Sequence, residues 1–366
     1  MVVREPQSVS LNDAASRDPK ERAVVHSFIY RRWTRTLHNA SSALFFLTLL
    51  AGTAVARGPI GARDADYQMA VTQAHSRYRD DHSGSIPDNV VASTGAAADS
   101  FGVVVVRIDG KIYEAGDAGI RFAQSTLAAP FTAALAIEQH GPDVLSGPKG
   151  AVAGTVPLPP ARGSADWGLA PTSALELDGS LATLSLLQPQ KDAEGKWKIL
   201  LESFGKFAGA GLALDQRAYR SDKPLVPRVP QIARDLGSDG RLADDAAITA
   251  DLYLRQCALT VSARELAIMA ATLANDGVNP VTQTRVISVA TAQKVQAMLA
   301  AKRKGHSAWM VKAGIAGSIG NTGGIIVVLP GRLGLATYSP PLDAAGVSVR
   351  GQRAVKYLSQ ALLFNP

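Results

Sequence analysis

The chain has 366 residues, 46% of them hydrophobic, which is enough apolar sequence to bury a sizeable core. A disordered or fibrous protein is therefore excluded. The formal net charge is +7, and residues 1–56, with seven Arg or Lys against four acids, supply +3 of it. The excess over the other 310 residues is too small and too scattered to favour binding to nucleic acid.

Cysteine and histidine usage argues against a metal site. Cys257 is the only cysteine, so no intrachain disulfide can form, and we interpret it as a small buried apolar residue. After residue 56 the histidines are His75, His82, His140 and His306, and none stands in an HExxH or similar ligand spacing. We predict neither a bound metal nor a cofactor.

Residues 1–56 have the layout of an N-terminal extension that ends in a secretory signal peptide. RRWTR (residues 31–35) precedes ASSALFFLTLLAGTAVA (residues 40–56), a mostly apolar run that ends in an Ala-x-Ala pattern. The sequence predicts cleavage after Ala56 and export to the periplasm or the medium. The alternative is an uncleaved segment that anchors the protein to the membrane through residues 40–56. In both cases the folded domain covers residues 57–366.

The first strands of that domain follow a polar helix in AVTQAHSRYRDDHSG (residues 70–84). FGVVVVRI and KIYEAG flank Asp109-Gly110, a pair typical of a type I′ turn, and so residues 101–116 predict an antiparallel hairpin. The four consecutive valines indicate that the first strand is buried on both faces.

The middle of the chain predicts helices separated by irregular segments. Residues 124–139 are rich in Ala, Leu and Ile and predict a buried helix, and residues 141–194 predict loops with short helices. YRSDKPLVPRVPQ (residues 219–231) has three prolines and is incompatible with one regular helix. A further helix begins at Ser262, where Glu265 completes a capping box.

The C-terminal end supplies two apolar strands around Pro330-Gly331 and a closing amphipathic helix over residues 349–364. Strands at both ends of the domain with helices between them predict an α/β fold. In this fold, one antiparallel sheet is built from N- and C-terminal strands and flanked by helices, and a helical subdomain is inserted.

Three long stretches carry a resemblance to a known family. They are FGVVVVRIDGKIYEAGD (residues 101–117), DLYLRQCALTVSARELAIMAATLANDGVNPVT (251–282) and GGIIVVLPGRLGLATYSPPLDAAGVSVRG (323–351). Through them, the chain resembles the bacterial-type glutaminases over residues 68–360. The resemblance implies the β-lactamase/transpeptidase-like fold. It also implies hydrolysis of the side-chain amide of L-glutamine through a serine acyl-enzyme, in which a Ser-x-x-Lys motif supplies nucleophile and base.

The Ser-x-x-Lys motif is altered in this sequence. The resemblance places the nucleophile at Thr126 and the lysine at Ala129, which cannot accept a proton. In the alternative register Ser125 is the nucleophile, and the residue three positions on is Ala128, again without a base. The sequence therefore predicts a domain that is degenerate in catalysis.

Other site positions implied by the resemblance are partly retained. Tyr253 and Asp222 keep a tyrosine and an acidic group, and Asn321 and Gly320 supply the backbone of the cleft, with the Asn321 N–H in the oxyanion hole. The substituted positions are Ala174, Val229, Arg303 and Ser318.

Each retained side chain also has a purely structural interpretation: Thr126 as a helix cap, Tyr253 as a core residue, and Asp222 as a turn residue.

Three functions stay open from the sequence. The first is an active glutaminase or amidohydrolase with an altered apparatus, and the second is a non-catalytic domain that binds a small amide or amino acid or serves in protein interactions. The third is a scaffold anchored to the membrane, and a membrane association is expected only in that case. The resemblance leaves a homo-oligomer open.

Overall fold

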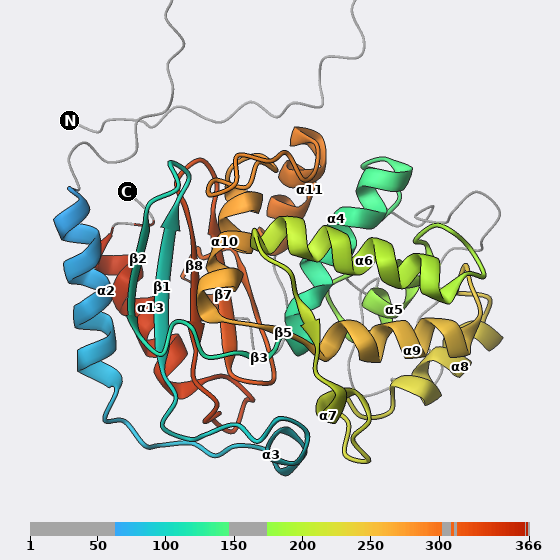
Figure 1. Cartoon of the computed structure of the whole chain (residues 1–366), viewed down its shortest axis with the longest axis horizontal. Coiled ribbons are helices and arrows are strands. Elements are labelled where there is room, and N and C mark those ends of the chain that lie inside the picture. The colour runs from blue at the N-terminus through green and yellow to red at the C-terminus, as the bar shows by residue number, and fades with distance from the viewer. Residues whose placement is uncertain (1–62, 146–173, 302–308, 311–312, 363, 365–366) are drawn as a thin grey trace, which may run out of the picture. The chain divides into compact units, whose positions relative to one another are not determined.

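Strands from the two ends of the domain form one antiparallel sheet, as the sequence predicts (Figure 1). The strands are β1 (Gly102–Arg107), β2 (Ile112–Gly116), β6 (Gly317–Ile319), β7 (Gly324–Leu329) and β8 (Leu333–Tyr338). Their order is β2-β1-β8-β7-β6, and β1 pairs with β8 from Gly102 opposite Tyr338 to Arg107 opposite Leu333. This computed structural model describes residues 63–145, 174–301, 309–310, 313–362 and 364.

Helices cover both faces of this sheet. Helix α10 (Ala263–Ala274) packs on one face, and helices α2 (Asp64–Tyr78) and α13 (Val349–Ala361) pack on the other (Figure 1). Successive residues of β1 point to opposite faces, so Val104 and Val106 join the core under α10 while Val103 and Val105 join the core under α2 and α13. All four valines are fully buried, which explains the uninterrupted apolar run.

The closest approach between α10 and the sheet is at Gly334 in β8. A Cβ atom at this position would lie 2.1 Å from the backbone nitrogen of Ala271 and 2.5 Å from the carbonyl oxygen of Ala267. Both are helix backbone atoms, which cannot move aside as the end of a flexible side chain can. Only glycine therefore permits α10 to lie this close to the sheet.

The helical part of the domain surrounds a second, smaller sheet. Its strands, in the order β3-β5-β4, are β3 (Phe122–Ala123), β5 (Leu259–Val261) and β4 (Ala213–Leu214). The remaining helices are α3 (Asp88–Thr94), the 3-10 turn η1 (Ser125–Ala128), α4 (Ala129–His140), α5 (Leu177–Ser185), α6 (Ala193–Ala208), α7 (Gln216–Tyr219), α8 (Val229–Ser238), α9 (Ala246–Cys257) and α11 (Val289–Ala300).

The predicted elements are confirmed where their local signals are strong. The hairpin of β1 and β2, the paired C-terminal strands, the closing helix and the capping box of Ser262 and Glu265 are all present.

One expectation needs correction. The helix expected at 124–139 begins as the 3-10 turn η1 and ends at His140.

Two other expectations are confirmed where the structure describes them. The described residues of 141–194 form loops and the short helix α5, and α6, a 16-residue helix capped by Asp192 that buries an apolar stripe, begins only at Ala193. Residues 219–231 do not form one regular helix, since α7 ends at Tyr219 and α8 begins at Val229 with a proline in its first turn.

A buried ion pair joins α6 to the start of α9. The Lys196 ammonium donates to the Asp244 carboxylate and to the Ser185 carbonyl, and both charged side chains are almost completely buried. Burial alone raises the pKa of the Asp244 carboxyl. The hydrogen bonds from Lys196 and from the N–H groups of Asp245 and Lys191 outweigh that effect and hold the pKa below its ordinary value.

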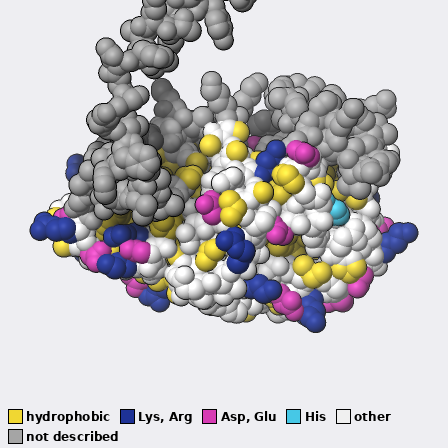
Figure 2. All heavy atoms as spheres, turned by 90° about the horizontal axis from the view of Figure 1, so that it is seen from above, with side chains coloured by type: hydrophobic (Ala, Val, Ile, Leu, Met, Phe, Trp, Pro, Cys, Tyr) yellow, Lys and Arg dark blue, Asp and Glu magenta, His cyan; other side chains and the backbone are white. Residues whose placement is uncertain are grey.

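The surface of the described residues carries mixed charge. On the face in Figure 2, basic and acidic side chains are interspersed and do not gather by sign. Within the described ranges, no helix is both long and apolar enough to cross a membrane. The predicted signal segment, residues 40–56, lies outside the described residues.

We expect Gly334→Ala to lower the free energy of unfolding by about 1–3 kcal/mol or more, because the added methyl group forces α10 away from the sheet. Denaturant unfolding measures the change. Gly211→Ala is the matched control, since no atom lies within 4 Å of a Cβ placed there. An equal effect at both positions would contradict the close contact.

The Lys196–Asp244 pair predicts a specific acid sensitivity. Because folding lowers the pKa of Asp244, the stabilisation is complete above the ordinary value of 3.8 and is lost as pH falls through the lower folded value. Lys196→Met alone leaves a buried carboxylate without its cation and should cost about 3–5 kcal/mol near neutral pH. In the double variant Lys196→Met/Asp244→Leu, the unfolding free energy should change less between about pH 5 and about pH 3 than in the parent protein.

Candidate active site

Ser125 lies where a short strand becomes a helical turn. Strand β3 pairs with β5, and the Gln124 N–H donates to the Leu259 carbonyl at 2.9 Å, so the chain enters η1 in a fixed direction. Ser125 has a φ of +49° and is fully buried. A positive φ is uncommon outside glycine, and such strained residues gather at functional sites. The positive φ marks Ser125 as a strained position at this junction, and Ser125 is one of the two candidate nucleophiles that the sequence offers.

The Ser125 hydroxyl donates a hydrogen bond to the side-chain carbonyl oxygen of Asn321 at 2.5 Å. The other end of the same amide, Nδ2 of Asn321, donates to the Leu225 carbonyl at 2.7 Å. Because the Leu225 carbonyl can only accept, the orientation of the Asn321 amide is fixed and Ser125 must be the donor to it. An amide oxygen accepts a hydrogen bond but is too weak a base to take the proton at neutral pH.

The turn that carries Asn321 is fastened to β3 and η1. Thr322 donates from its hydroxyl to the Ala123 carbonyl at 2.9 Å, and the Gly320 N–H donates to the Gly324 carbonyl at 2.8 Å. The Leu127 side chain packs on this turn: Cβ atoms at Gly320 and Gly324 would lie 2.9 Å and 2.6 Å from it. The two glycines thus let the turn approach η1 closely.

Two backbone N–H groups at this junction are open. Neither the N–H of Ser125 nor that of Asn321 donates a hydrogen bond to another residue that the structure describes. Backbone donors of this kind can stabilise the negative charge that develops on an attacked carbonyl oxygen, whatever the side chains are.

No base is hydrogen-bonded to the serine among the residues that the structure describes. Ala128, three residues after Ser125, and Ala129 are both buried and carry no proton acceptor. Among the described residues, no lysine or histidine nitrogen is hydrogen-bonded to the Ser125 hydroxyl, and the buried Lys196 is paired with Asp244. Thr126 is half-buried, and its hydroxyl makes no hydrogen bond within the described part of the chain. The hydrogen bond to Asn321 distinguishes Ser125 from Thr126, and which of the two is the nucleophile stays a prediction.

Tyr253 is buried in α9, which packs against η1. Burial raises the pKa of Tyr253 well above its ordinary value. A phenol of this kind stays protonated at neutral pH and cannot act as the missing base. Burial likewise raises the pKa of the Cys257 thiol, in agreement with a packed apolar residue.

The other predicted site positions differ in how they relate to Ser125 and Asn321. Asp222 is exposed and lies in the same loop as Leu225, whose carbonyl accepts a hydrogen bond from Asn321. The loop therefore reaches the site, but the Asp222 carboxylate makes no described contact with it. Val229 is fully buried as the first residue of α8, and Ser318 is buried in β6. Ala174 begins the described segment before α5, and Arg303 lies outside the described residues.

Sequence reasoning missed the role of the Asn321 side chain. Only its backbone N–H was assigned, through the resemblance, whereas its carboxamide makes the sole hydrogen bond of the Ser125 hydroxyl within the described residues. The available signal was a single asparagine among the glycines of SIGNTGG (residues 318–324).

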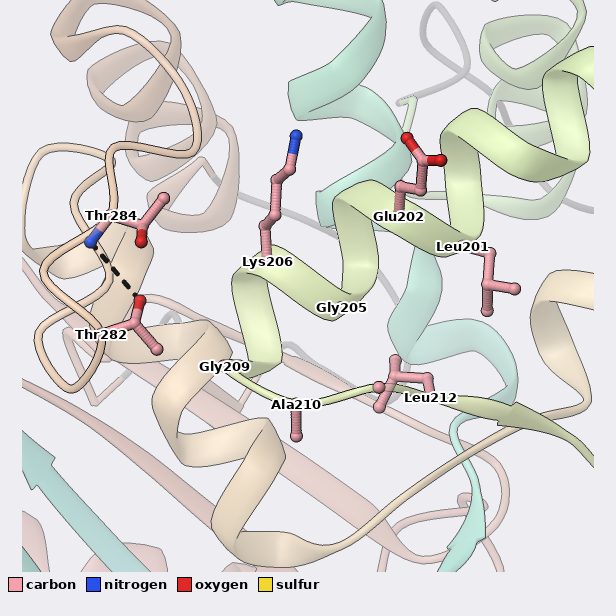
Figure 3. A pocket seen from close by; sticks show the side chains of 10 residues that line it. Leu201, Glu202, Gly205, Lys206, Gly209, Ala210, Leu212, Thr282 and Thr284 are labelled. Carbon is pink, nitrogen blue, oxygen red and sulfur yellow. Dashed lines mark hydrogen bonds between the residues drawn. The ribbon is translucent and has the colours of Figure 1, made fainter.

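A separate hollow of about 560 Å³ lies at the C-terminal end of α6 (Figure 3). It is lined by Leu201, Leu212 and the backbone of Gly209, with Thr282 and Thr284 on the facing loop. None of its lining residues belongs to the Ser125 site, so the hollow is not the cleft in front of the serine. Within the described residues, no cluster of acidic, histidine and cysteine side chains could hold a metal ion.

Known proteins are similar to this chain over most of the domain. The glutaminase family model matches residues 84–365. Glutaminase 2 of Yersinia pestis is 35% identical over 294 residues, which span 80% of this chain and 86% of that protein. The glutaminase of Bacteroides thetaiotaomicron is 32% identical over 305 residues, which span 82% of this chain and 94% of that protein.

Solved structures agree with the sequence relatives. A probable glutaminase named YbaS superposes with a TM-score of 0.75 at 32% identity and covers 83% of this chain and 99% of its own. Mglu in its glutamate form has a TM-score of 0.71 at 27% identity and covers 84% of this chain and 70% of its own. These neighbours share the β-lactamase-like fold, and the family model spans most of the domain. The chain belongs to the glutaminase family.

Proposed function

We propose that this domain binds L-glutamine or a closely related amide in the glutaminase site and hydrolyses it very slowly or not at all. The observation that carries the proposal is the Ser125 hydroxyl, which donates to the neutral Asn321 amide at 2.5 Å and is bonded to no base among the described residues. The ligand class is supported by the glutaminase relatives and by Mglu, which was solved in a glutamate form.

Hydrolysis of the glutamine side chain needs three things from such a site. An oxygen nucleophile must attack the amide carbon, a base must remove its proton, and donors must stabilise the oxyanion until ammonia leaves and water releases glutamate. Ser125 supplies the oxygen, and the open N–H groups of Ser125 and Asn321 support the third requirement. No residue in the described part of the chain meets the second requirement, the base.

The missing base is expected to cost most of the rate. A positioned general base contributes roughly 10²–10⁴-fold, and a serine hydroxyl at its ordinary pKa gains little over water. Ala128 and Ala129, the two residues at the lysine position of the altered motif, carry only buried methyl groups, so neither supplies a base. Binding does not need that proton transfer, which is why we separate ligand binding from turnover.

An active enzyme with an altered apparatus is the alternative. Asp222 is the acidic group that could favour it, since its loop contacts Asn321 through the Leu225 carbonyl. The Asp222 carboxylate is exposed and has no described contact to the serine, so the inactive reading is the stronger one.

The central prediction concerns a restored lysine. We expect the unmodified protein to release no measurable ammonia from L-glutamine, and Ala128→Lys to gain at least about 10²-fold, because a lysine three residues after Ser125 lies one turn along and can accept its proton. Ala128→Met is the matched control, since it adds a side chain of similar length without an amine. A gain in Ala129→Lys would instead support the register in which Thr126 is the nucleophile. Circular dichroism and thermal melting establish that these variants fold.

Two further variants identify the nucleophile. If the unmodified protein hydrolyses glutamine and Ser125→Ala abolishes the reaction, the domain is an active enzyme and the proposal is wrong. If Thr126→Ala alone abolishes it, the register implied by the sequence is correct. Binding is measured separately as the rise in melting temperature with millimolar L-glutamine or L-glutamate, and the absence of any rise would count against a retained ligand site.

We also propose that the domain is exported. The support is the arginine cluster at 31–35 followed by the apolar run at 40–56 with its Ala-x-Ala end. N-terminal sequencing of the protein from a cell fraction outside the cytoplasm should give a mature end near Arg57. A mature chain that retains residues 40–56 and sediments with membranes would instead support the anchored alternative.

A further inference from the structure

The carboxamide of Asn321 is held at both ends inside the candidate site. Its carbonyl oxygen lies 2.5 Å from the Ser125 oxygen, and its nitrogen lies 2.7 Å from the Leu225 carbonyl oxygen. The amide thus bridges the serine of η1 and the loop that precedes α8. No other side chain in the described part of the chain is hydrogen-bonded to the Ser125 hydroxyl.

This group is chemically the same as the reacting end of glutamine. Both side chains end in a primary carboxamide, one methylene further from the backbone in glutamine. A ligand amide that is to be attacked must place its carbonyl carbon about 3–3.5 Å from the serine oxygen. The Asn321 carbonyl oxygen lies 2.5 Å from the Ser125 oxygen, so a ligand amide cannot approach the hydroxyl from that side while the Asn321 amide is in place.

We propose that the Asn321 side chain is an internal occupant of the amide subsite and sets the affinity of the site, because a ligand must displace it. This inference rests on the proposed function, since it takes the position in front of Ser125 as the place where the ligand amide binds. Asn321 is a positioning residue in this role: it determines whether the Ser125 hydroxyl is free to face a ligand.

The surroundings of Asn321 permit the displacement. The residue is half-buried, in contrast to the fully buried Ser125, and it lies in a turn between Gly320 and Gly323. Its side chain is held by two hydrogen bonds and is not enclosed in the core. Rotation about its side-chain bonds would break both bonds, after which the Ser125 hydroxyl and the Leu225 carbonyl would be available to a ligand.

The loop on the other side stays in place without Asn321. Asn89 donates to the carbonyls of Pro224 and Leu225 at 3.1 Å and 3.3 Å, and Ser93 donates to the Lys223 carbonyl at 2.5 Å. Helix α3 therefore fastens the loop independently. Asn89→Ala, which removes a second donor to the same Leu225 carbonyl without touching Ser125, is the matched control.

The test is the affinity of the full chain for L-glutamate, measured by calorimetry, in the parent protein and in Asn321→Ala. L-Glutamate is the probe because it is not hydrolysed and its side-chain carboxylate takes the position of the amide. We expect Asn321→Ala to bind on the order of tenfold tighter, since two hydrogen bonds no longer have to be broken. Asn89→Ala should bind as the parent does.

Asn321→Gly is the second variant and keeps the inference testable if Asn321→Ala does not fold. It removes the same two bonds and leaves Ser125 in place, so we expect a similar gain in affinity. A merely structural role of Asn321 predicts weaker binding in both variants, because the site would lose order. Unchanged or weaker affinity in the folded variants, or no binding in any of them, overturns the inference.

The outcome is independent of the proposed loss of activity. Glutamine hydrolysis by the parent protein would contradict that loss while leaving the glutamate affinities to decide the role of Asn321. Conversely, an inactive parent whose affinity does not respond to Asn321→Ala would retain the proposed function and lose this inference.

Discussion

The pairing of β1 with β8 is the constraint on which the candidate site depends. Tyr338 at the end of β8 lies opposite Gly102 of β1 on one side and Gly324 of β7 on the other. The Phe122 ring stacks on the Tyr338 ring with centroids 3.7 Å apart and an angle of 8° between planes. Since Phe122 belongs to β3, just before η1, this stack sets the N-terminal part of the site against the C-terminal strands.

The site itself is the meeting point of these two parts. Ser125 and Asn321 are separated by 196 positions in the chain, and their hydrogen bond forms only because β7, β8 and β3 have been brought together. The glycines at 320 and 324 let Leu127 of η1 pack directly on the turn that carries Asn321. Packing thus determines where the serine and the backbone donors lie, and it does so without any catalytic side chain.

The sequence predicts a feature well when the residues that specify it lie close together in the chain. The Asp109-Gly110 hairpin and the capping box of Ser262 rest on residues close together in the chain, and both were predicted correctly. The resemblance carried the global fold, which no local pattern specifies. Local patterns also missed the length of α6, because its stripe of Leu200, Phe204 and Phe207 has meaning only beside the helices it packs on.

Sequence spacing could not determine which residue is the nucleophile. A positive φ at Ser125 and the reach of the Asn321 amide are three-dimensional facts that arise from β3 pairing with β5 and from the turn after β6. Spacing alone could not choose between Ser125 and Thr126, since neither is followed by a lysine three residues later. The sequence showed that the motif lacks its lysine, but it did not show that the Asn321 amide accepts the hydrogen bond of the Ser125 hydroxyl.

The Asn321 amide and the alanine at position 128 are complementary in physical terms. A lysine at the Ala128 position would be a buried amine that needs hydrogen-bond partners, and the Ser125 hydroxyl would be one of them. Without that lysine the fully buried hydroxyl of Ser125 would lack a partner, at a cost of about 1–3 kcal/mol. The Asn321 amide removes this cost with a neutral group. A site that has no base is thereby satisfied internally, and the same hydrogen bond that stabilises it keeps the serine proton on the serine.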